Sequence, residues 1–322
     1  MQKHILLYEQ FLDQEPVNEG FKELLVSTAI SIGLLVASPE VKGQSDISKL
    51  DGPEYCKSVY TDSVLQKAKD YWKNWLESPA TLEKIAKNYK TTAEDIKSNY
   101  VPKWLEIIEP LKIVYKNMAR WDIAAVDTSA SKKEVYVNPK SIVFKPNFRA
   151  KYEEDPIRTL VHELQHKMSS LIPINPAEVV TAALGQRTDP RTGKYHIAFG
   201  DDVLKRIGED LGVDMEKHKR RAYYYWDAFR YSKSVNTYAK SPTEMVSRIN
   251  ALKYKYGIKP EDQHGLKPEM FRQTFLKEKV DADMDWILVA WAGYGFPPFQ
   301  EFLDRLGSLA ANSKNKTQTD QA

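Results

Sequence analysis

The sequence has a single cysteine, Cys56, among 322 residues. This excludes an intrachain disulfide, and it leaves no cysteine spacing typical of a zinc finger. The chain also lacks a strong net charge, because 47 basic residues nearly balance 44 acidic residues and leave a net charge of +3. Composition therefore gives no global electrostatic reason to expect specific binding of nucleic acid.

The sequence also has no apolar segment that would span a bilayer comfortably. Leu24–Ala37 is an apolar run of about 14 residues, which is short for a membrane span and close to the length of a signal-peptide core. We expect no stable transmembrane span, and we keep a signal segment of a secreted or periplasmic protein, or a buried helix, as alternatives. A signal peptide should begin with a short positive segment. The acidic residues before this run are Glu9, Asp13, Glu15, Glu19 and Glu23.

One motif stands out, His162-Glu-Leu-Gln-His166, which has the H-E-x-x-H pattern of zinc peptidases. On a helix, positions four apart lie on nearly the same side, so the two imidazoles would converge on one ion. Glu163 would then lie beside that ion, where it is placed to take a proton from the water on the metal. The motif predicts Zn²⁺ held by His162 and His166, with Glu163 as the general base.

The residues around the motif favour a helix. Asp155 is a typical N-cap, Pro156 fits the first helical turn, and Pro173 ends the segment. The motif lies opposite an apolar stripe and is expected to face a polar cleft lined by small side chains. The stripe, which recurs at helical spacing and should face the core, consists of Ile157, Leu160, Val161, Leu164, Met168 and Leu171.

A catalytic zinc site needs a third protein ligand and keeps one position open for water. Ile172 stands six residues beyond His166, so the third histidine of a metzincin is missing. The main candidates are Glu244, at the end of Ser-Pro-Thr-Glu, and Glu178, at the end of Asn-Pro-Ala-Glu. Both glutamates also fit capping boxes, in which they would only fold back on the start of a helix. Further alternatives are His196, His218 and Asp201.

The run from Tyr238 to Arg248, Tyr-Ala-Lys-Ser-Pro-Thr-Glu-Met-Val-Ser-Arg, resembles the second motif of gluzincin-type domains common in phage and mobile-element proteins. In those domains H-E-x-Q-H is followed by a tyrosine, a short turn and E-x-x-A-R. The resemblance covers residues 155–172 and 238–256, with Ser247 in place of the usual alanine. It implies a zincin-like fold, and it implies that Glu244 completes the zinc site.

Elsewhere the sequence predicts an α+β fold that is mainly helical, with a small mixed sheet beside the motif helix. Strands are expected at 122–127, 134–138 and 141–145, which are rich in β-branched and apolar residues. Zincins place such a strand along the cleft, where its backbone pairs an extended peptide. Helices are expected at 61–76, 81–89, 91–100, 102–118, 201–231, 271–292 and 299–309.

The expected organisation has four regions. Residues 1–43 form a leader or targeting segment, 44–121 an N-terminal helical region, 122–310 the zincin-like metallopeptidase domain and 311–322 a disordered tail. The helical region is expected to pack on the metallopeptidase domain, and an independent adaptor domain is the alternative.

The first 20 residues carry a second resemblance. Ile5–Gln14 and Val17–Gly20 resemble head-targeting leaders of internal proteins in large tailed phages, which are trimmed after a glutamate. The two resemblances together imply a phage virion or the host cytoplasm as the location, with other virion proteins as candidate partners.

These patterns predict a zinc-dependent peptidase that hydrolyses bonds in a peptide or protein substrate. Tyr238, or one of Tyr223–Tyr225, is the candidate donor to the oxyanion. Two other classes remain open. One is a virion or structural protein that keeps a zincin fold without activity, and the other is a peptidoglycan-binding module at the host surface with a structural zinc. A closed four-ligand site would indicate the latter.

Overall fold

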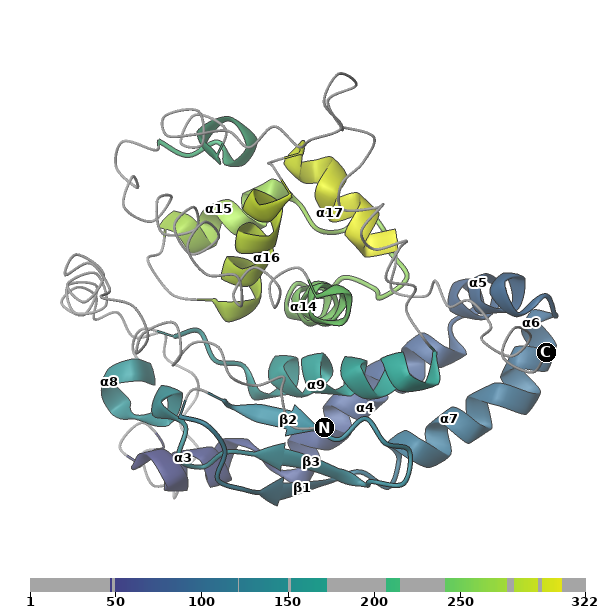
Figure 1. The fold of residues 1–322 in the computed structure, drawn as a ribbon, viewed down its shortest axis with the longest axis horizontal. Coiled ribbons are helices and arrows are strands. Elements are labelled where there is room, and N and C mark those ends of the chain that lie inside the picture. The colour runs from purple at the N-terminus through teal and green to yellow at the C-terminus, as the bar shows by residue number, and fades with distance from the viewer. Residues whose placement is uncertain are drawn as a thin grey trace, which may run out of the picture.

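A computed structural model describes Ile47 and residues 50–120, 122–149, 152–172, 207–214, 241–276, 281–294 and 297–308. Within these residues the chain is mainly helical and has one small mixed sheet of three strands. The predicted fold class is confirmed at this level. Figure 1 shows the sheet at the bottom, helix α9 (Pro156–Leu171) above it, and C-terminal helices at the top.

The N-terminal part is helical, and its sequence explains where the helices begin. Thr61 caps α4 by accepting a hydrogen bond from the Val64 amide, and Thr92 caps α6 in the same way. The helices predicted at 61–76, 81–89 and 91–100 are confirmed, the last with a π-helical second half. The elements are α3 (Gly52–Val59), α4 (Asp62–Glu77), α5 (Pro79–Tyr89), α6 (Ala93–Asp95), the π-helix η2 (Ile96–Tyr100) and α7 (Val101–Ile108).

The helix predicted at 102–118 is wrong beyond its first turns. Helix α7 ends at Ile108, and the chain continues as strand β1 (Lys112–Tyr115). Pro110 explains the difference, because proline has no amide hydrogen and its ring clashes with the preceding helical turn. The β-branched pair Ile113-Val114 then favours an extended chain.

The sheet has the strand order β1–β3–β2, where β2 is Ala124–Val126 and β3 is Glu134–Val137. Strand β1 runs parallel to β3, and β2 runs antiparallel to it with Ala125 opposite Tyr136. The strands predicted at 122–127 and 134–138 are confirmed. Among the described residues β2 is an edge strand, and it packs beside α9.

The strand predicted at 141–145 is wrong. Residues Ile142–Phe144 form one turn of 3-10 helix, η3, which is followed by the short helix α8 (Pro146–Arg149). All three side chains of η3 are buried. The amides of Phe144 and Lys145 close the turn by donating to the carbonyls of Ser141 and Ile142, at 3.2 and 3.0 Å.

The first hydrophobic core lies between the sheet, α4 and α9. Trp72 of α4 is fully buried, and its indole nitrogen donates to the Val161 carbonyl of α9 at 3.2 Å. Val135 and Val137 contribute from β3. Helices α3 to α7 share this core with α9, while the predicted limits of the four regions stay predictions.

The C-terminal helices enclose a second core, which includes Met284, Phe271 and Phe302. Instead of one helix at 271–292 there are two, because Asp281 starts α16 by accepting from the amides of Asp283 and Met284. The helix predicted at 299–309 is confirmed. Within 201–231, the structure describes residues 207–214, of which 207–211 are helical. The elements are α14 (Pro242–Lys255), α15 (Pro268–Leu276), α16 (Ala282–Gly293) and α17 (Phe299–Ser308).

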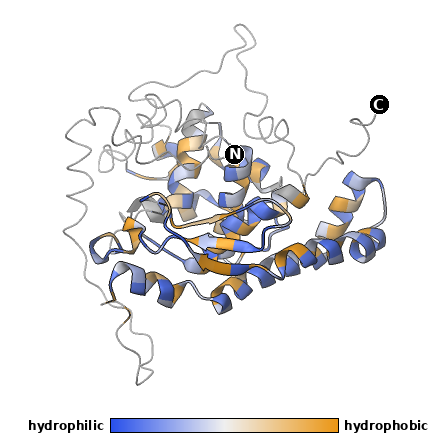
Figure 2. Cartoon of the chain, turned by 60° about the horizontal axis from the view of Figure 1, so that its bottom comes forward, coloured by the Kyte–Doolittle hydropathy of each residue, from blue (hydrophilic) through white to orange (hydrophobic). Residues whose placement is uncertain are grey.

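Polar and apolar residues are distributed as expected for packed amphipathic helices. Figure 2 shows hydrophobic and hydrophilic residues in alternation along the helices at the bottom of that view. Within the described ranges, no helix combines the length and the apolar character needed to cross a membrane. The segment Leu24–Ala37, the rest of the predicted leader and the predicted tail lie outside those ranges.

Candidate metal centre

Helix α9 positions the H-E-x-x-H motif. The Asp155 carboxylate accepts hydrogen bonds from the amides of Ile157 and Arg158, which confirms the predicted N-cap. The predicted apolar stripe is confirmed as well. Its residues Leu160, Val161, Leu164 and Met168 are buried, and Ile157 and Leu171 are partly buried.

The motif lies on the side of α9 that faces α14, which packs across α9 and is seen nearly end-on in Figure 1. His162 is only 9% exposed, so this side is more enclosed than the polar cleft predicted from the sequence. The small residue Ser247, buried in the middle of α14, satisfies its hydroxyl on the Thr243 carbonyl of its own helix. A small side chain at this position favours close packing of the two helices.

Helix α14 positions Glu244. Met245, Ile249 and Leu252 are fully buried, and they fix the side of α14 that faces the protein interior. Within the described residues, the Ser241 side chain makes no capping hydrogen bond. The Glu244 carboxylate instead reaches the motif histidines, so its capping-box interpretation is wrong.

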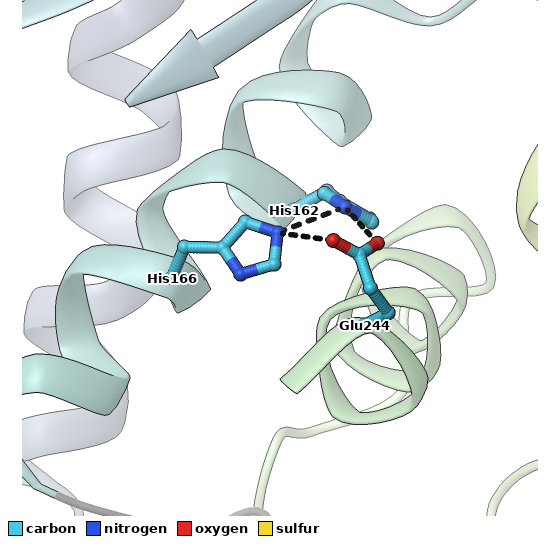
Figure 3. A group of neighbouring side chains, drawn as sticks. All are labelled: His162, His166 and Glu244. Carbon is cyan, nitrogen blue, oxygen red and sulfur yellow. Dashed lines mark hydrogen bonds and ion pairs between the residues drawn. The ribbon is translucent and has the colours of Figure 1, made fainter. Parts of the chain in front are cut away.

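The two histidines and Glu244 converge on one point (Figure 3). Nε2 of His162 lies 3.3 Å from Nε2 of His166. The two Glu244 oxygens each approach one histidine, with Oε2 at 3.5 Å from His162 Nε2 and Oε1 at 3.4 Å from His166 Nε2. Two imidazole nitrogens and a carboxylate oxygen therefore face one another in a partly buried position.

The donor set fits a zinc ion. In a tetrahedral site with zinc–nitrogen bonds of about 2.0–2.1 Å, neighbouring ligand atoms are about 3.3–3.4 Å apart. The distance between the two histidine nitrogens, 3.3 Å, matches that spacing, and the Glu244 carboxylate presents one oxygen to each nitrogen at 3.5 and 3.4 Å. Two histidines and one glutamate are also a common ligand set of catalytic zinc sites.

Asp283, which the sequence interpretation missed, contacts the other nitrogen of His162. Its Oδ1 lies 3.3 Å from His162 Nδ1. A carboxylate on Nδ1 keeps the hydrogen there, so Nε2 is the nitrogen that would give its lone pair to an ion. The carboxylate–histidine arrangement is common around zinc because it fixes the tautomer and the ring orientation of the ligand.

A buried ionic network holds Asp283 in place. Arg158, one turn before His162, lies with Nε at 3.4 Å from Asp283 Oδ2 and with Nη1 at 2.6 Å from Asp281 Oδ2. Lys255 adds a second contact to Asp281 at 2.6 Å. The start of α16 is thereby fixed to both α9 and α14.

Arg248 holds the Glu244 carboxylate in place. Its Nη2 donates to Glu244 Oε2 at 3.0 Å, and its Nη1 lies 3.7 Å from Asp283 Oδ1. The guanidinium also lies over the Trp286 ring, 5.5 Å from the centroid. Arg248 thus connects the carboxylate that faces the histidines with the carboxylate behind His162.

These contacts and burial shift the pKa values of His162, His166 and Glu244 in different directions. Burial disfavours a charged His162, but its hydrogen bonds to Asp283 and Glu244 outweigh burial and raise its pKa to about 10. Burial lowers the pKa of His166 to about 4. Burial acts to raise the pKa of Glu244, but the His162 hydrogen bond and Arg248 hold it well below its usual range.

Glu163 lies beside this cluster on α9. Burial raises the pKa of its carboxyl group to about 8. Positive charge at His162 and Arg248 opposes the shift, while the carboxylates of Glu244 and Asp122 add to it. A carboxyl group with such a pKa exchanges protons near neutral pH.

Several predicted site residues lie outside the described residues. They are Tyr238, Glu178, His196, His218, Asp201 and Tyr223–Tyr225. Asp283 was missed because residues 281–283 were placed inside one continuous helix at 271–292, whereas Asp281 caps the start of a new helix. The aspartates ahead of the apolar stretch 286–291 were the available signal, although nothing in them indicated a histidine partner.

Comparisons of this chain with protein-family models, with curated proteins and with solved structures give no match.

Proposed function

We propose that this protein is a zinc-dependent peptidase with a zincin-like arrangement of α9, α14 and the small sheet. The observation that carries the proposal is that His162 Nε2 and His166 Nε2, 3.3 Å apart, both face the Glu244 carboxylate, whose Oε2 lies 3.5 Å from the first nitrogen and whose Oε1 lies 3.4 Å from the second. His162, His166 and Glu244 would hold the ion. Zinc held there would supply a Lewis acid that polarises a carbonyl and makes water a better nucleophile at neutral pH.

Glu163 performs the proton transfers in this proposal. It follows His162 on the same helix turn, and its carboxyl group exchanges protons near neutral pH. The carboxylate accepts a proton from the attacking water and returns it to the amine that leaves as the peptide bond breaks. Asp283 and Arg248 orient His162 and Glu244 and take no part in the proton transfer.

Strand β2 is the proposed binding edge for substrate. It forms one of the two edges of the sheet among the described residues and packs beside α9, which carries Glu163. An extended peptide would add to this edge through backbone hydrogen bonds.

The three-ligand cluster favours a catalytic zinc over a structural one. In the described part of the chain, the candidate metal ligands that come together are His162, His166 and Glu244. A structural zinc is normally held by four protein ligands, whereas a catalytic zinc keeps one position for water. Measurements of zinc content and of hydrolysis together distinguish a catalytic zinc from a structural zinc and from an inactive zincin fold.

The test compares wild type with Glu163→Gln and His162→Ala. Zinc content is measured by elemental analysis, and hydrolysis is followed by mass spectrometry on a mixed peptide library. We expect one zinc per chain in wild type and in Glu163→Gln, and much less in His162→Ala. Glu163→Gln should lose turnover by a factor of about 10² to 10⁴ or more.

Each other outcome has a defined meaning. Zinc bound at one equivalent without hydrolysis in wild type would favour the structural or inactive alternatives. Hydrolysis at the wild-type rate in Glu163→Gln would exclude Glu163 as the general base. A wild-type protein that binds no zinc would contradict the proposal as a whole.

A further inference from the structure

A buried pair of amide side chains joins the two helices that carry the metal ligands. Asn250 Nδ2 on α14 donates to Gln165 Oε1 on α9 at 2.7 Å. Gln165 is 3% exposed and Asn250 is fully buried. Gln165 is the residue just before His166, so this bond lies directly beside the proposed site.

The Gln165 amide group is held at both ends. Its Oε1 accepts from Asn250, and its Nε2 donates to Ser169 Oγ at 2.9 Å, one turn further along α9. Ser169 Oγ in turn donates to the Gln165 carbonyl at 2.9 Å. These hydrogen bonds fix the orientation of the Gln165 side chain, so its Oε1 faces Asn250 on α14.

The position of Asn250 on α14 matters for Glu244. The two residues are six positions apart, which is about 9 Å along a helix axis at 1.5 Å per residue. With a single contact, one helix can still rotate about the contact point on the other. Two contacts at that separation fix both the crossing angle of α14 on α9 and the position of α14 along its own axis. The Glu244–histidine contacts are one of these points, and the Asn250–Gln165 hydrogen bond is the other.

This pair is poorly explained as a source of stability. Burying two amides costs free energy that one hydrogen bond only partly offsets. Within the described residues, the buried Asn250 Oδ1 also has no hydrogen-bond partner. A buried polar residue of this kind is best known for fixing register, as a single asparagine does in a coiled coil.

We infer that the Asn250–Gln165 hydrogen bond sets the register of α14 on α9 and thereby places Glu244 at the two histidines. Gln165 and Asn250 are positioning residues, because they act through Glu244 and do not touch the proposed metal position. The inference rests on the proposed zinc site. It adds a role to the second variable residue of the H-E-x-x-H motif.

The test uses two double variants and Co²⁺ in place of zinc, with no measurement of activity. Gln165→Leu with Asn250→Leu replaces both partners by apolar groups of similar size, so the unfolding midpoint should stay close to that of wild type. We expect its Co²⁺ affinity to fall about 10- to 100-fold, as for other residues that orient a ligand, and its visible absorption spectrum to change. Gln165→Asn with Asn250→Gln exchanges the amides, keeps the pair and should restore affinity and spectrum.

The outcomes separate this inference from the proposed function. Wild type that binds neither Co²⁺ nor Zn²⁺ overturns the proposed function and this inference with it. Wild type that binds Co²⁺, with a leucine pair of equal affinity and unchanged spectrum, overturns only the inference. If the leucine pair does not fold, Asn250→Ser is measured in the same way, and unchanged affinity and spectrum there overturn the inference.

Discussion

Nδ1 of His162 lies 3.3 Å from Oδ1 of Asp283, although the two residues come from helices in different parts of the chain, α9 and α16. Both side chains are nearly buried, at 11% and 10% exposure. Arg158 and Arg248 approach the same carboxylate, at 3.4 and 3.7 Å, and compensate its charge. The proposed zinc site thus depends on a residue outside the H-E-x-x-H motif.

Asp283→Asn should weaken zinc binding. Asparagine keeps the size of the side chain and removes the charge that orients His162, a loss that typically costs about 10- to 100-fold in metal affinity. The affinity is measured by competition with a chelator of known affinity. Asp285→Asn, which removes an equal charge from the same helix turn, is the matched control and should bind zinc like wild type. Equal affinities in the two variants would show that Asp283 does not orient His162.

Zinc affinity should rise with pH. In the metal-free protein the pKa of His162 is raised to about 10 through Asp283 and Glu244, against the effect of burial, so the ring carries an extra proton at neutral pH. Zinc must displace this proton, and displacement of one proton raises the affinity about tenfold for each pH unit below that pKa. Other charged or titratable side chains face the same region and contribute to the proton release measured in wild type. They are Glu244, His166, Glu163, Arg248 and Arg158.

The pH prediction is checked by calorimetry in buffers that differ in ionisation enthalpy, which reports the number of protons released on binding. Asp283→Asn provides the internal comparison. Without the carboxylate the pKa of His162 should fall, so fewer protons leave when zinc binds at neutral pH. Proton release that is the same in both proteins would mean that His162 does not hold the displaced proton.

The part of the site that follows from helical periodicity was predictable from the sequence. His162 and His166 share one side of α9 because they are four residues apart, and Asp155 and the apolar stripe identify the helix. From its local pattern alone Glu244 was one of several candidates, and the resemblance to gluzincin-type domains selected it. Its segment has a capping-box pattern, and the choice between cap and ligand depends on where α14 packs, which local sequence does not encode.

Other features depend on tertiary contacts or on single residues that interrupt a pattern. Asp283 meets His162 only because Asp281 starts a new helix that is tied to Arg158. The helix predicted at 102–118 is wrong because periodicity outweighed Pro110 in the interpretation. Short apolar runs such as Ile142–Phe144 fit either a buried strand or a helical turn, and the run alone does not distinguish them.

Glu244→Ala and Glu178→Ala should separate the two candidates for the third ligand. Glu244 lies within 3.5 Å of both histidines, while Glu178 lies outside the described residues. We expect Glu244→Ala to lose more than the roughly 10- to 100-fold in affinity typical of residues that only orient a ligand. Glu178→Ala should bind zinc like wild type, and circular dichroism of both variants checks that they fold. The reverse order of affinities would assign the ligand to Glu178.

Lys167, the residue after His166, fastens the loop between β2 and β3 to α9. Its side chain is fully buried, and its ammonium group donates to the carbonyls of Asp127 and Lys132 at 2.9 Å each, and to that of Ser129. Lys167→Met keeps the length of the side chain but leaves three carbonyls without their donor. The free energy of unfolding, measured with urea, should fall by about 1–3 kcal/mol.

Lys132→Met is the matched control for Lys167→Met, because the Lys132 side chain is exposed and only its backbone carbonyl meets the ammonium group. A surface change of this kind usually alters stability by less than about 0.5 kcal/mol. Zinc affinity should stay close to wild type in both variants, since the Lys167 ammonium group contacts carbonyls of the loop between β2 and β3, and the Lys132 side chain is exposed. If β2 is the binding edge for substrate, Lys167→Met should raise KM more than it lowers kcat, because a loosened loop affects where the peptide binds and leaves Glu163 in place. Equal stability of Lys167→Met and Lys132→Met would mean that water replaces the ammonium group at little cost, and β2 would then need another anchor on α9.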